Sequence, residues 1–207
     1  FRREHGLADR FVVMYSGNHS PCHPLDTLLA AALNLKGCDD VMFCFVGGGS
    51  EQEKVNDFAS RHELTNIKVL PYQPLDSLSA SLSAADLHVV VMGEQFVGIV
   101  HPCKIYNIMS VGAPMLYIGP QPSHVTDIAS HNETKELFLT HHGDVNSVAE
   151  SILLAREQQA RVQETRIFRK DRILPQLVNA IGGTNVENVF RALPDSDNSL
   201  TDYHAAH

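Results

Sequence analysis

The chain has 207 residues, 43% of them hydrophobic, which is enough to bury one full core and makes a single domain the default expectation. Its 24 Asp and Glu outnumber its 16 Lys and Arg, and the resulting formal net charge of -8 argues against a broad basic face for nucleic acid or anionic lipid. No apolar run approaches the roughly 20 residues needed to span a bilayer, and no signal peptide is visible.

Predicted strands and helices alternate along the chain. Runs of β-branched and aromatic residues predict six strands, at 11–15, 41–46, 67–70, 87–92, 115–118 and 136–140. Apolar residues at helical spacing predict helices at 24–35, 51–62, 75–85, 104–111 and 123–130, and a long helical stretch from residue 144. Ser50 and Asp144 are placed as helix N-caps. Such alternation implies parallel strands joined by right-handed crossovers.

The predicted fold is therefore α/β, a Rossmann-like, doubly wound parallel sheet with helices on both faces and a helical C-terminal extension. This domain is expected to span residues 11–193, and the polar segment 194–207 to be a tail that frays. The chain begins Phe-Arg-Arg without a methionine, and its first strand already starts at Phe11. We therefore expect a fragment of a longer polypeptide, in which residues 1–10 are a linker from an absent N-terminal domain.

The cysteine pattern bears on compartment and on metal binding. Four cysteines occur, without Cys-x-x-Cys spacing, so reduced thiols in a cytoplasmic protein are expected. His19, Cys22 and His23 have side chains that zinc prefers, but a fourth ligand at motif spacing is missing. Cys103 follows a proline, yet the deaminase pattern of a His-x-Glu and a Cys-x-x-Cys is absent. We expect no metal.

The run 101–114, His-Pro-Cys-Lys-Ile-Tyr-Asn-Ile-Met-Ser-Val-Gly-Ala-Pro, is the most informative segment. It is typical of a loop, a short helix and a Gly-x-Pro stop before the next strand. The loop would deliver Lys104 beside a helix N-terminus, at the sheet edge where open α/β folds bind ligands. These features favour an anion such as phosphate, and the alternative is a surface lysine whose stem lies on apolar residues.

Glycines follow the first two predicted strands. In Ser16-Gly17-Asn18-His19, Gly17 would let the chain pass near a diphosphate that Asn18 and His19 could hydrogen-bond. Gly47-Gly48-Gly49-Ser50 suits close approach of a phosphate, but Gln52 stands where the third glycine of a dinucleotide motif belongs. Ordinary turns remain the alternative for both segments.

Glu94 and Gly98 lie in the predicted loop after the strand 87–92. At the carboxyl end of a strand, a carboxylate could accept hydrogen bonds from sugar hydroxyls, and a glycine could expose backbone amides. The alternative for Glu94 is a solvated loop acid.

Together, six motifs resemble, in order and spacing, the donor-binding half of family-four glycosyltransferases, and the colanic-acid and exopolysaccharide branch is most similar. They are Tyr15-Ser16-Gly17-Asn18, Val46-Gly47-Gly48-Gly49-Ser50, Leu70-Pro71-Tyr72-Gln73-Pro74, Ala84-Ala85-Asp86-Leu87, Pro102-Cys103-Lys104-Ile105-Tyr106 and Gly112-Ala113-Pro114. The resemblance covers about residues 11–155. It implies one half of a GT-B fold, in which the C-terminal of two Rossmann-like halves binds a nucleotide sugar.

The resemblance also implies roles for individual residues. Those expected near the donor are Gly17, Asn18 and His19 at the diphosphate, Tyr72 and Gln73 at the base, Glu94 to Gly98 at the sugar, and Lys104 at a phosphate. Gly47, in the glycine loop described above, is also expected to bind the substrate. Glu94 and Lys104 are the predicted catalytic residues. Asn107 stands where the family has an acid that holds the ribose hydroxyls, so its hydrogen bonds lack charge assistance. His23 stands where a lysine is often found, which leaves more of the phosphate binding to Lys104.

The leading hypothesis is a metal-independent, retaining glycosyltransferase. This chain would bind a nucleoside-diphosphate sugar for transfer to a glycan or lipid-linked acceptor and would stabilise the leaving diphosphate electrostatically. The full-length protein is expected in the cytoplasm, and acceptor recognition and any contact with the inner membrane face belong to the absent half. Two alternatives stay open at this point, a nucleotide-sugar epimerase of the same architecture and a non-catalytic nucleotide-binding module.

Overall fold

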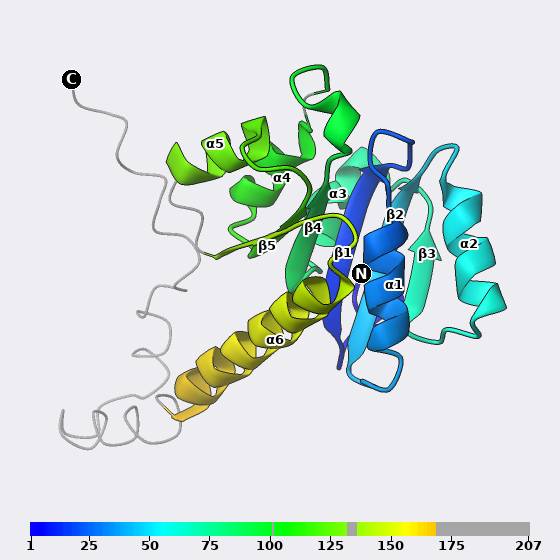
Figure 1. Ribbon diagram of the computed structural model, residues 1–207. Coiled ribbons are helices and arrows are strands. Elements are labelled where there is room, and N and C mark those ends of the chain that lie inside the picture. The colour runs from blue at the N-terminus through cyan, green and yellow to red at the C-terminus, as the bar shows by residue number, and fades with distance from the viewer. Residues whose placement is uncertain (101, 132–135, 169–207) are drawn as a thin grey trace, which may run out of the picture. The chain divides into compact units, whose positions relative to one another are not determined.

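The computed structural model describes residues 1–100, 102–131 and 136–168 (Figure 1). The strands are β1 (Phe11–Asn18), β2 (Val41–Gly48), β3 (Ile67–Leu70), β4 (Leu87–Val91), β5 (Met115–Ile118) and β6 (Leu137–Thr140). The helices are α1 (Asp26–Asn34), α2 (Gln52–Arg61), α3 (Leu75–Leu82), the 3-10 turn η1 (Glu94–Phe96), α4 (Lys104–Ser110), α5 (His124–His131) and α6 (Val145–Phe168). One compact unit runs from Phe1 to Gln159, and α6 extends beyond it.

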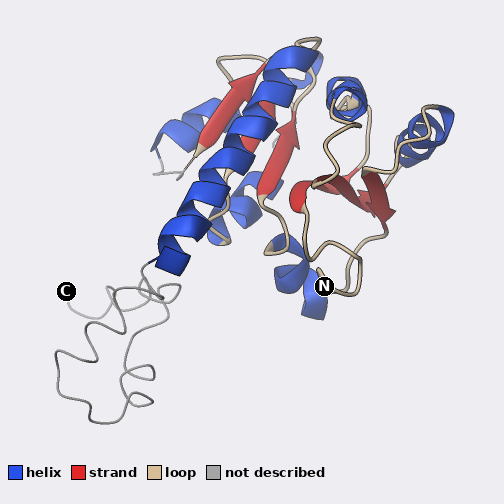
Figure 2. Ribbon diagram, turned by 90° about the horizontal axis from the view of Figure 1, so that it is seen from below, coloured by secondary structure: helices blue, strands red, loops and turns tan. Residues whose placement is uncertain are grey.

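All neighbouring strands of the sheet are parallel, in the order β3-β2-β1-β4-β5-β6. Helices cover both faces of this sheet (Figures 1 and 2). The predicted doubly wound α/β fold is therefore confirmed. Strand order reverses between β1 and β4, and in such sheets the crevice at the carboxyl ends of the strands beside this switch is where ligands bind.

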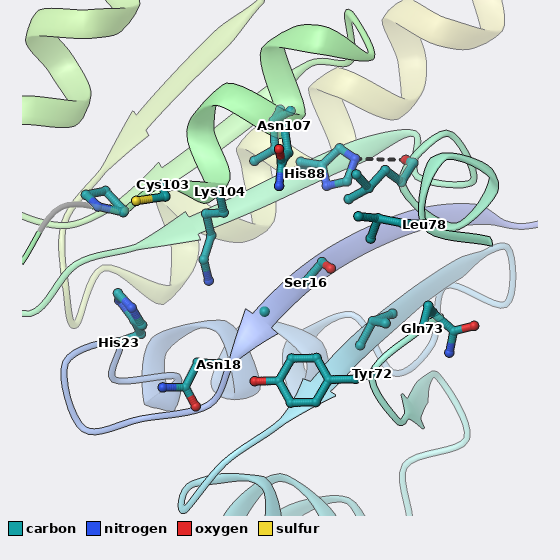
Figure 3. A pocket seen from close by; sticks show the side chains of 15 residues that line it. Ser16, Asn18, His23, Tyr72, Gln73, Leu78, His88, Cys103, Lys104 and Asn107 are labelled. Carbon is teal, nitrogen blue, oxygen red and sulfur yellow. Dashed lines mark hydrogen bonds between the residues drawn. The ribbon is translucent and has the colours of Figure 1, made fainter. Parts of the chain in front are cut away.

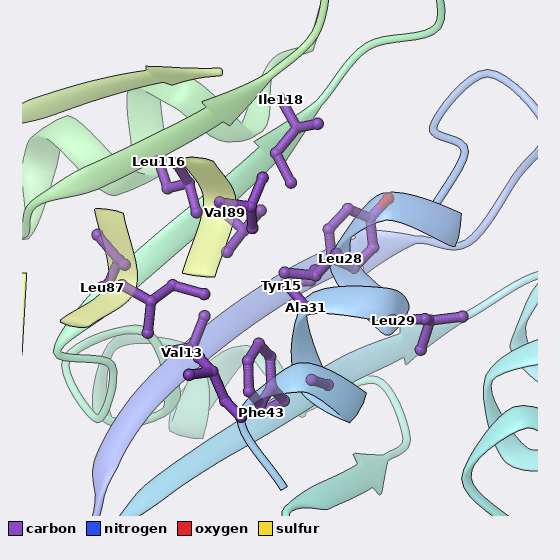
Figure 4. Close-up of a cluster of buried hydrophobic side chains, with 14 of the residues drawn as sticks. Val13, Tyr15, Leu28, Leu29, Ala31, Phe43, Leu87, Val89, Leu116 and Ile118 are labelled. Carbon is purple, nitrogen blue, oxygen red and sulfur yellow. The ribbon is translucent and has the colours of Figure 1, made fainter. Parts of the chain in front are cut away.

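The two faces of the sheet bury separate sets of side chains, because successive residues of a strand point to opposite faces. On one face, odd-numbered residues such as Val13, Phe43 and Val89 pack with α1 and with the first turns of α6 (Figure 4). On the other face, Val90 and Met115 pack with α4 and α5. All five residues of β4 are buried, as expected for a central parallel strand covered on both sides.

The ends of β1 and β2 extend beyond the predicted 11–15 and 41–46. Gly17 pairs with Gly47 in the parallel register, and Asn18 pairs with Gly48. A glycine run alone gives no strand signal, so sequence patterns could not show this extension.

Only one of the two predicted N-caps is confirmed. Ser50 does not cap α2, because Glu51 occupies the N-cap and no side-chain capping bond forms. Asp144 does cap α6, since its Oδ1 accepts a hydrogen bond from the Ser147 N–H at 3.0 Å.

The first ten residues contact the sheet rather than stand apart from it. Leu7 is fully buried with Val12 and Met14. Whether residues 1–10 also connect to a preceding domain stays a prediction.

The expected tail 194–207 and the adjoining part of the predicted domain, 169–193, lie outside the described residues. Among the described residues, no helix combines the length and the apolar character needed to cross a membrane.

Asp86 connects the N-terminal segment, residues 1–10, to the sheet. Its carboxylate accepts a hydrogen bond from the Val12 N–H at 2.7 Å and from two nitrogens of Arg2 at 3.0 and 3.1 Å. Gln159 also donates to this carboxylate. The Asp86 side chain is only 6% exposed, so these bonds replace water that the carboxylate has lost.

We predict that Asp86→Ala lowers the free energy of unfolding by about 3 kcal/mol, because the substitution leaves a buried N–H and a guanidinium without their acceptor. Asp40→Ala is the matched control, because it removes a carboxylate that pairs with Arg156 but is 55% exposed. Its cost should stay below about 1 kcal/mol. Urea unfolding of both variants makes the comparison, and equal losses would contradict the prediction.

Candidate functional site

A cavity of about 350 Å³ lies at the carboxyl ends of β1 and β2, at the topological switch of the sheet (Figure 3). Side chains from both sides of the switch line it. They are Ser16, Gly17, Asn18, His23, Val46, Tyr72, Gln73, Leu78, Leu82, His88, Pro102, Cys103, Lys104, Asn107 and Ile108. The cavity thus joins segments that are far apart in the sequence.

Lys104 extends from the start of α4 into this cavity (Figure 3). Its Nζ is buried and has no hydrogen-bond partner in the described part of the chain. It lies 3.6 Å from the centroid of the Tyr15 ring, a cation–π contact. Burial lowers the pKa of Lys104 to about 7. Burial therefore favours the neutral form of a side chain that has no hydrogen-bond acceptor among the described residues.

Glycine is required where β1 and β2 end. A Cβ on Gly47 would lie 2.0 Å from the carbonyl oxygen of Gly17, and a Cβ on Gly49 would lie 2.2 Å from the carbonyl oxygen of His19. Gly17 has a φ of 130°, which side chains rarely adopt, and Nζ of Lys104 lies 3.5 Å from the position a Cβ would take. The glycines therefore let two strand ends and the lysine approach one another.

The two predicted phosphate-site histidines occupy different surroundings. His19 is fully buried, packs edge-on against Tyr15 and has no hydrogen bond at either ring nitrogen among the described residues. His23 lines the cavity, and its Nδ1–H donates to the Val91 carbonyl at 2.7 Å. Burial lowers the pKa of both histidines. At neutral pH neither adds a positive charge to the one that Lys104 can carry.

Tyr72, Gln73 and Asn107 complete the predicted polar groups at the cavity. Tyr72 is 59% exposed, its ring lies against Gly48, and its hydroxyl donates to the Gly48 carbonyl at 3.2 Å. The Gln73 amide donates to the Pro71 carbonyl at 2.9 Å. Asn107 lies three residues after Lys104 on α4, a spacing that puts both side chains on one helix face.

Seven predicted residues line this one cavity: Gly17, Asn18, His23, Tyr72, Gln73, Lys104 and Asn107. Two further predicted residues contact neighbours of the cavity. Gly47 lies against Gly17, which lines the cavity, and His19 packs against Tyr15, whose ring contacts Lys104. Glu94 and Gly98 are exposed and are not among the residues that line it. The functional roles of all these residues stay predictions.

The sequence interpretation missed His88, Ser16 and the apolar side of the cavity formed by Leu78, Leu82 and Ile108. A signal for His88 was present, because it is the single polar residue in the strand Leu87–Val91. The helix predicted at 75–85 carries no signal of a site, because apolar periodicity does not distinguish a face that packs from one that lines a cavity.

Comparisons with known proteins agree with this geometry. Residues 1–171 match the family described as glycosyl transferases group 1. Among curated proteins, WcaI of Escherichia coli (strain K12), named as a colanic acid biosynthesis glycosyl transferase, is 26% identical over 185 residues. The match covers 83% of this chain but 43% of WcaI, so the chain spans less than half the length of that relative.

Solved structures share the fold. Anabaena Alr3699/HepE in complex with UDP superposes with a TM-score of 0.60 and 21% identity, over 76% of this chain and 42% of that one. The same protein has been solved with UDP-glucose. The catalytic domain of cholesterol-α-glucosyltransferase from Helicobacter pylori superposes with a TM-score of 0.58 and 16% identity, over 73% of this chain and 89% of that domain.

The burial of Lys104 predicts a pH-dependent stability. The pKa of Lys104 is about 7 in the fold, against 10.5 when unperturbed, so the unfolded state binds more protons between these values. Stability contributed by this group must then rise with pH across that interval, by up to about 1.4 kcal/mol per pH unit. Urea unfolding of the parent and of Lys104→Met between pH 7 and 8.5 measures this difference, since stability should rise with pH more steeply in the parent than in the variant.

Proposed function

The chain belongs to the glycosyl transferases group 1 family, and we propose that it binds the nucleoside diphosphate of a sugar donor in the cavity around Lys104. The buried, unpartnered ammonium of Lys104 is the observation that carries this proposal. A diphosphate supplies the acceptors and the negative charge that this group lacks, and such pairing is strongest where water is excluded.

The glycine-lined strand ends support a diphosphate next to the lysine. Gly17 has no side chain to separate its backbone from Lys104, whose Nζ lies 3.5 Å from the position that a Cβ would take. Asn18 lines the same cavity and offers an amide donor to phosphate oxygens. The site thus offers one cation, Lys104, together with neutral hydrogen-bond donors. This combination suits a small anion such as a diphosphate better than a large polyanion, which would need several positive charges.

Nucleoside binding follows from the exposed face of Tyr72 and the amide of Asn107. An aromatic ring that is open on one side can stack on a base. The amide of Asn107 can hydrogen-bond the ribose hydroxyls without charge assistance. We assign Gln73, beside Tyr72 in the loop after β3, to the base as well.

For the whole protein we propose retaining transfer of the sugar to a glycan or lipid-linked acceptor in exopolysaccharide synthesis. Lys104 would stabilise the charge that develops on the leaving diphosphate, the task a divalent ion performs in other transferases, so we propose a metal-independent reaction. Glu94 and Gly98 are proposed to meet the sugar. Acceptor recognition is assigned to a part of the protein outside this chain, as are any membrane contacts, and the cytoplasm is the proposed compartment.

Calorimetric titration with UDP, GDP and ADP tests donor binding. We expect UDP to bind, in line with the UDP complexes of the similar Anabaena protein. Lys104→Met should weaken that binding at least tenfold, since it removes a charge-assisted hydrogen bond. Lys54→Met is the control, because that lysine pairs with Asp26 at the surface. Absence of binding by all three nucleotides at millimolar concentration would refute the proposal.

Binding should also weaken as pH rises above 7. The bound diphosphate favours charged Lys104, whose pKa is about 7 without ligand, so binding in this range takes up a proton. The dissociation constant for UDP is then expected to rise by up to about tenfold per pH unit between pH 7 and 9. The phosphates themselves are fully ionised above their second pKa near 6. A flat profile for the parent would contradict the assignment of Lys104.

A further inference from the structure

His88 is a buried imidazole inside an otherwise apolar strand. The residue lies in β4, between Leu87 and Val89, and is 1% exposed. Burying a polar ring costs free energy unless its nitrogens find partners. The residue nevertheless lines the cavity that Lys104 enters.

One ring nitrogen of His88 is satisfied by the protein. Its Nε2–H donates to the Leu82 carbonyl at 2.9 Å, the bond drawn in Figure 3. Burial lowers the pKa of His88 to about 4, so the ring is neutral at physiological pH. With the proton held on Nε2, the Nδ1 nitrogen carries a lone pair and can only accept a hydrogen bond.

The Nδ1 atom of His88 has no partner among the described residues, and it is not sealed from solvent as the ring nitrogens of His19 are. In Figure 3 it points toward the cavity. His88 pairs in register with Met14, so Ser16, two residues farther along β1, faces the same side of the sheet. A buried acceptor thus opens onto the ligand side of the sheet.

The surroundings of this acceptor suit a nucleoside better than a phosphate. Leu78, Ser16 and Asn107 lie around His88 in Figure 3, and Leu82 and Ile108 add to the apolar lining of the cavity. A fully ionised diphosphate has no hydrogen to donate, and its oxygens would be repelled by the Nδ1 lone pair. A base N–H or a ribose hydroxyl has the required hydrogen.

We propose that His88 recognises the nucleoside of the donor, with its Nδ1 accepting a hydrogen bond from a base N–H or a ribose O–H. This inference rests on the proposed function, because it places the nucleoside of the same donor in the part of the cavity beside His88. Leu82 acts through the Nε2 bond, which fixes the tautomer that leaves Nδ1 as an acceptor. Removal of that acceptor should therefore weaken nucleotide binding without removing the diphosphate contacts.

Two substitutions separate the role of His88 in binding from its role in folding. In His88→Gln, the longer side chain can place its amide where Nε2 was and keep the bond to Leu82, but the Nδ1 acceptor is lost. In His88→Asn, an amide oxygen can replace Nδ1, but the bond to Leu82 is lost. We expect His88→Gln to bind UDP about tenfold more weakly with a thermal midpoint near that of the parent. His88→Asn should bind UDP like the parent but unfold at a lower temperature.

Analogues of UDP identify the hydrogen that His88 accepts. N3-methyl-UDP lacks the base N–H, and 2′-deoxy-UDP and 3′-deoxy-UDP each lack one ribose hydroxyl. The analogue that lacks the recognised donor should bind the parent about tenfold more weakly than UDP, yet bind His88→Gln no more weakly than UDP does. A loss that is the same in the parent and in His88→Gln reports a steric effect instead.

Two results would overturn the inference, and they can be told apart. If the parent binds UDP and His88→Gln binds it equally well, His88 does not recognise the nucleoside, while the proposed function stands. If the parent binds none of UDP, GDP and ADP, both proposals fail together.

Discussion

The ammonium of Lys104 is buried without a hydrogen-bond acceptor among the described residues, which costs desolvation free energy. The other features of the cavity are best understood in relation to this buried charge. Burial shifts the equilibrium of the side chain toward its neutral form, and the Tyr15 ring offers only a weak substitute for an anion. Glycine at positions 17 and 47 is what allows the lysine and two strand ends to meet so closely. On the proposed function, the diphosphate of the donor supplies the negative charge that favours the ammonium form.

The neutral histidines follow from the same constraint. His19 and His23 lie near Lys104, and a second positive charge there would raise the cost of burial further. Because burial holds these rings neutral, they contribute shape and lone pairs rather than charge. Burial lowers the pKa of His88 as well, and its Nε2 is bound to the Leu82 carbonyl. On the proposed arrangement, its Nδ1 accepts a hydrogen bond from the ligand. The site therefore divides into a chargeable region at Lys104 and a neutral region at His88.

Most of the fold could be predicted because its signals are local. Apolar runs and turn residues placed all six strands, and the run 101–114 placed Lys104 beside the start of a short helix. The strand extensions through Gly17 and Gly47 could not be predicted, since they depend on pairing between two chain segments. His88 was missed for a related reason, because only the tertiary arrangement shows that its strand position opens onto a cavity.

Glu94 and Gly98 are exposed and do not line the cavity, yet the structure links the start of their loop to the site. The Gly93 N–H donates to the Cys22 carbonyl at 2.9 Å, which ties the loop after β4 to the loop after β1. His23, the next residue after Cys22, lines the cavity and binds the Val91 carbonyl. On the proposed arrangement, the donor would run from its nucleoside at His88 through the diphosphate at Lys104 to a sugar near this junction. An exposed position for Glu94 suits a group whose ligand lies at the rim, where the remaining part of the protein would complete the site.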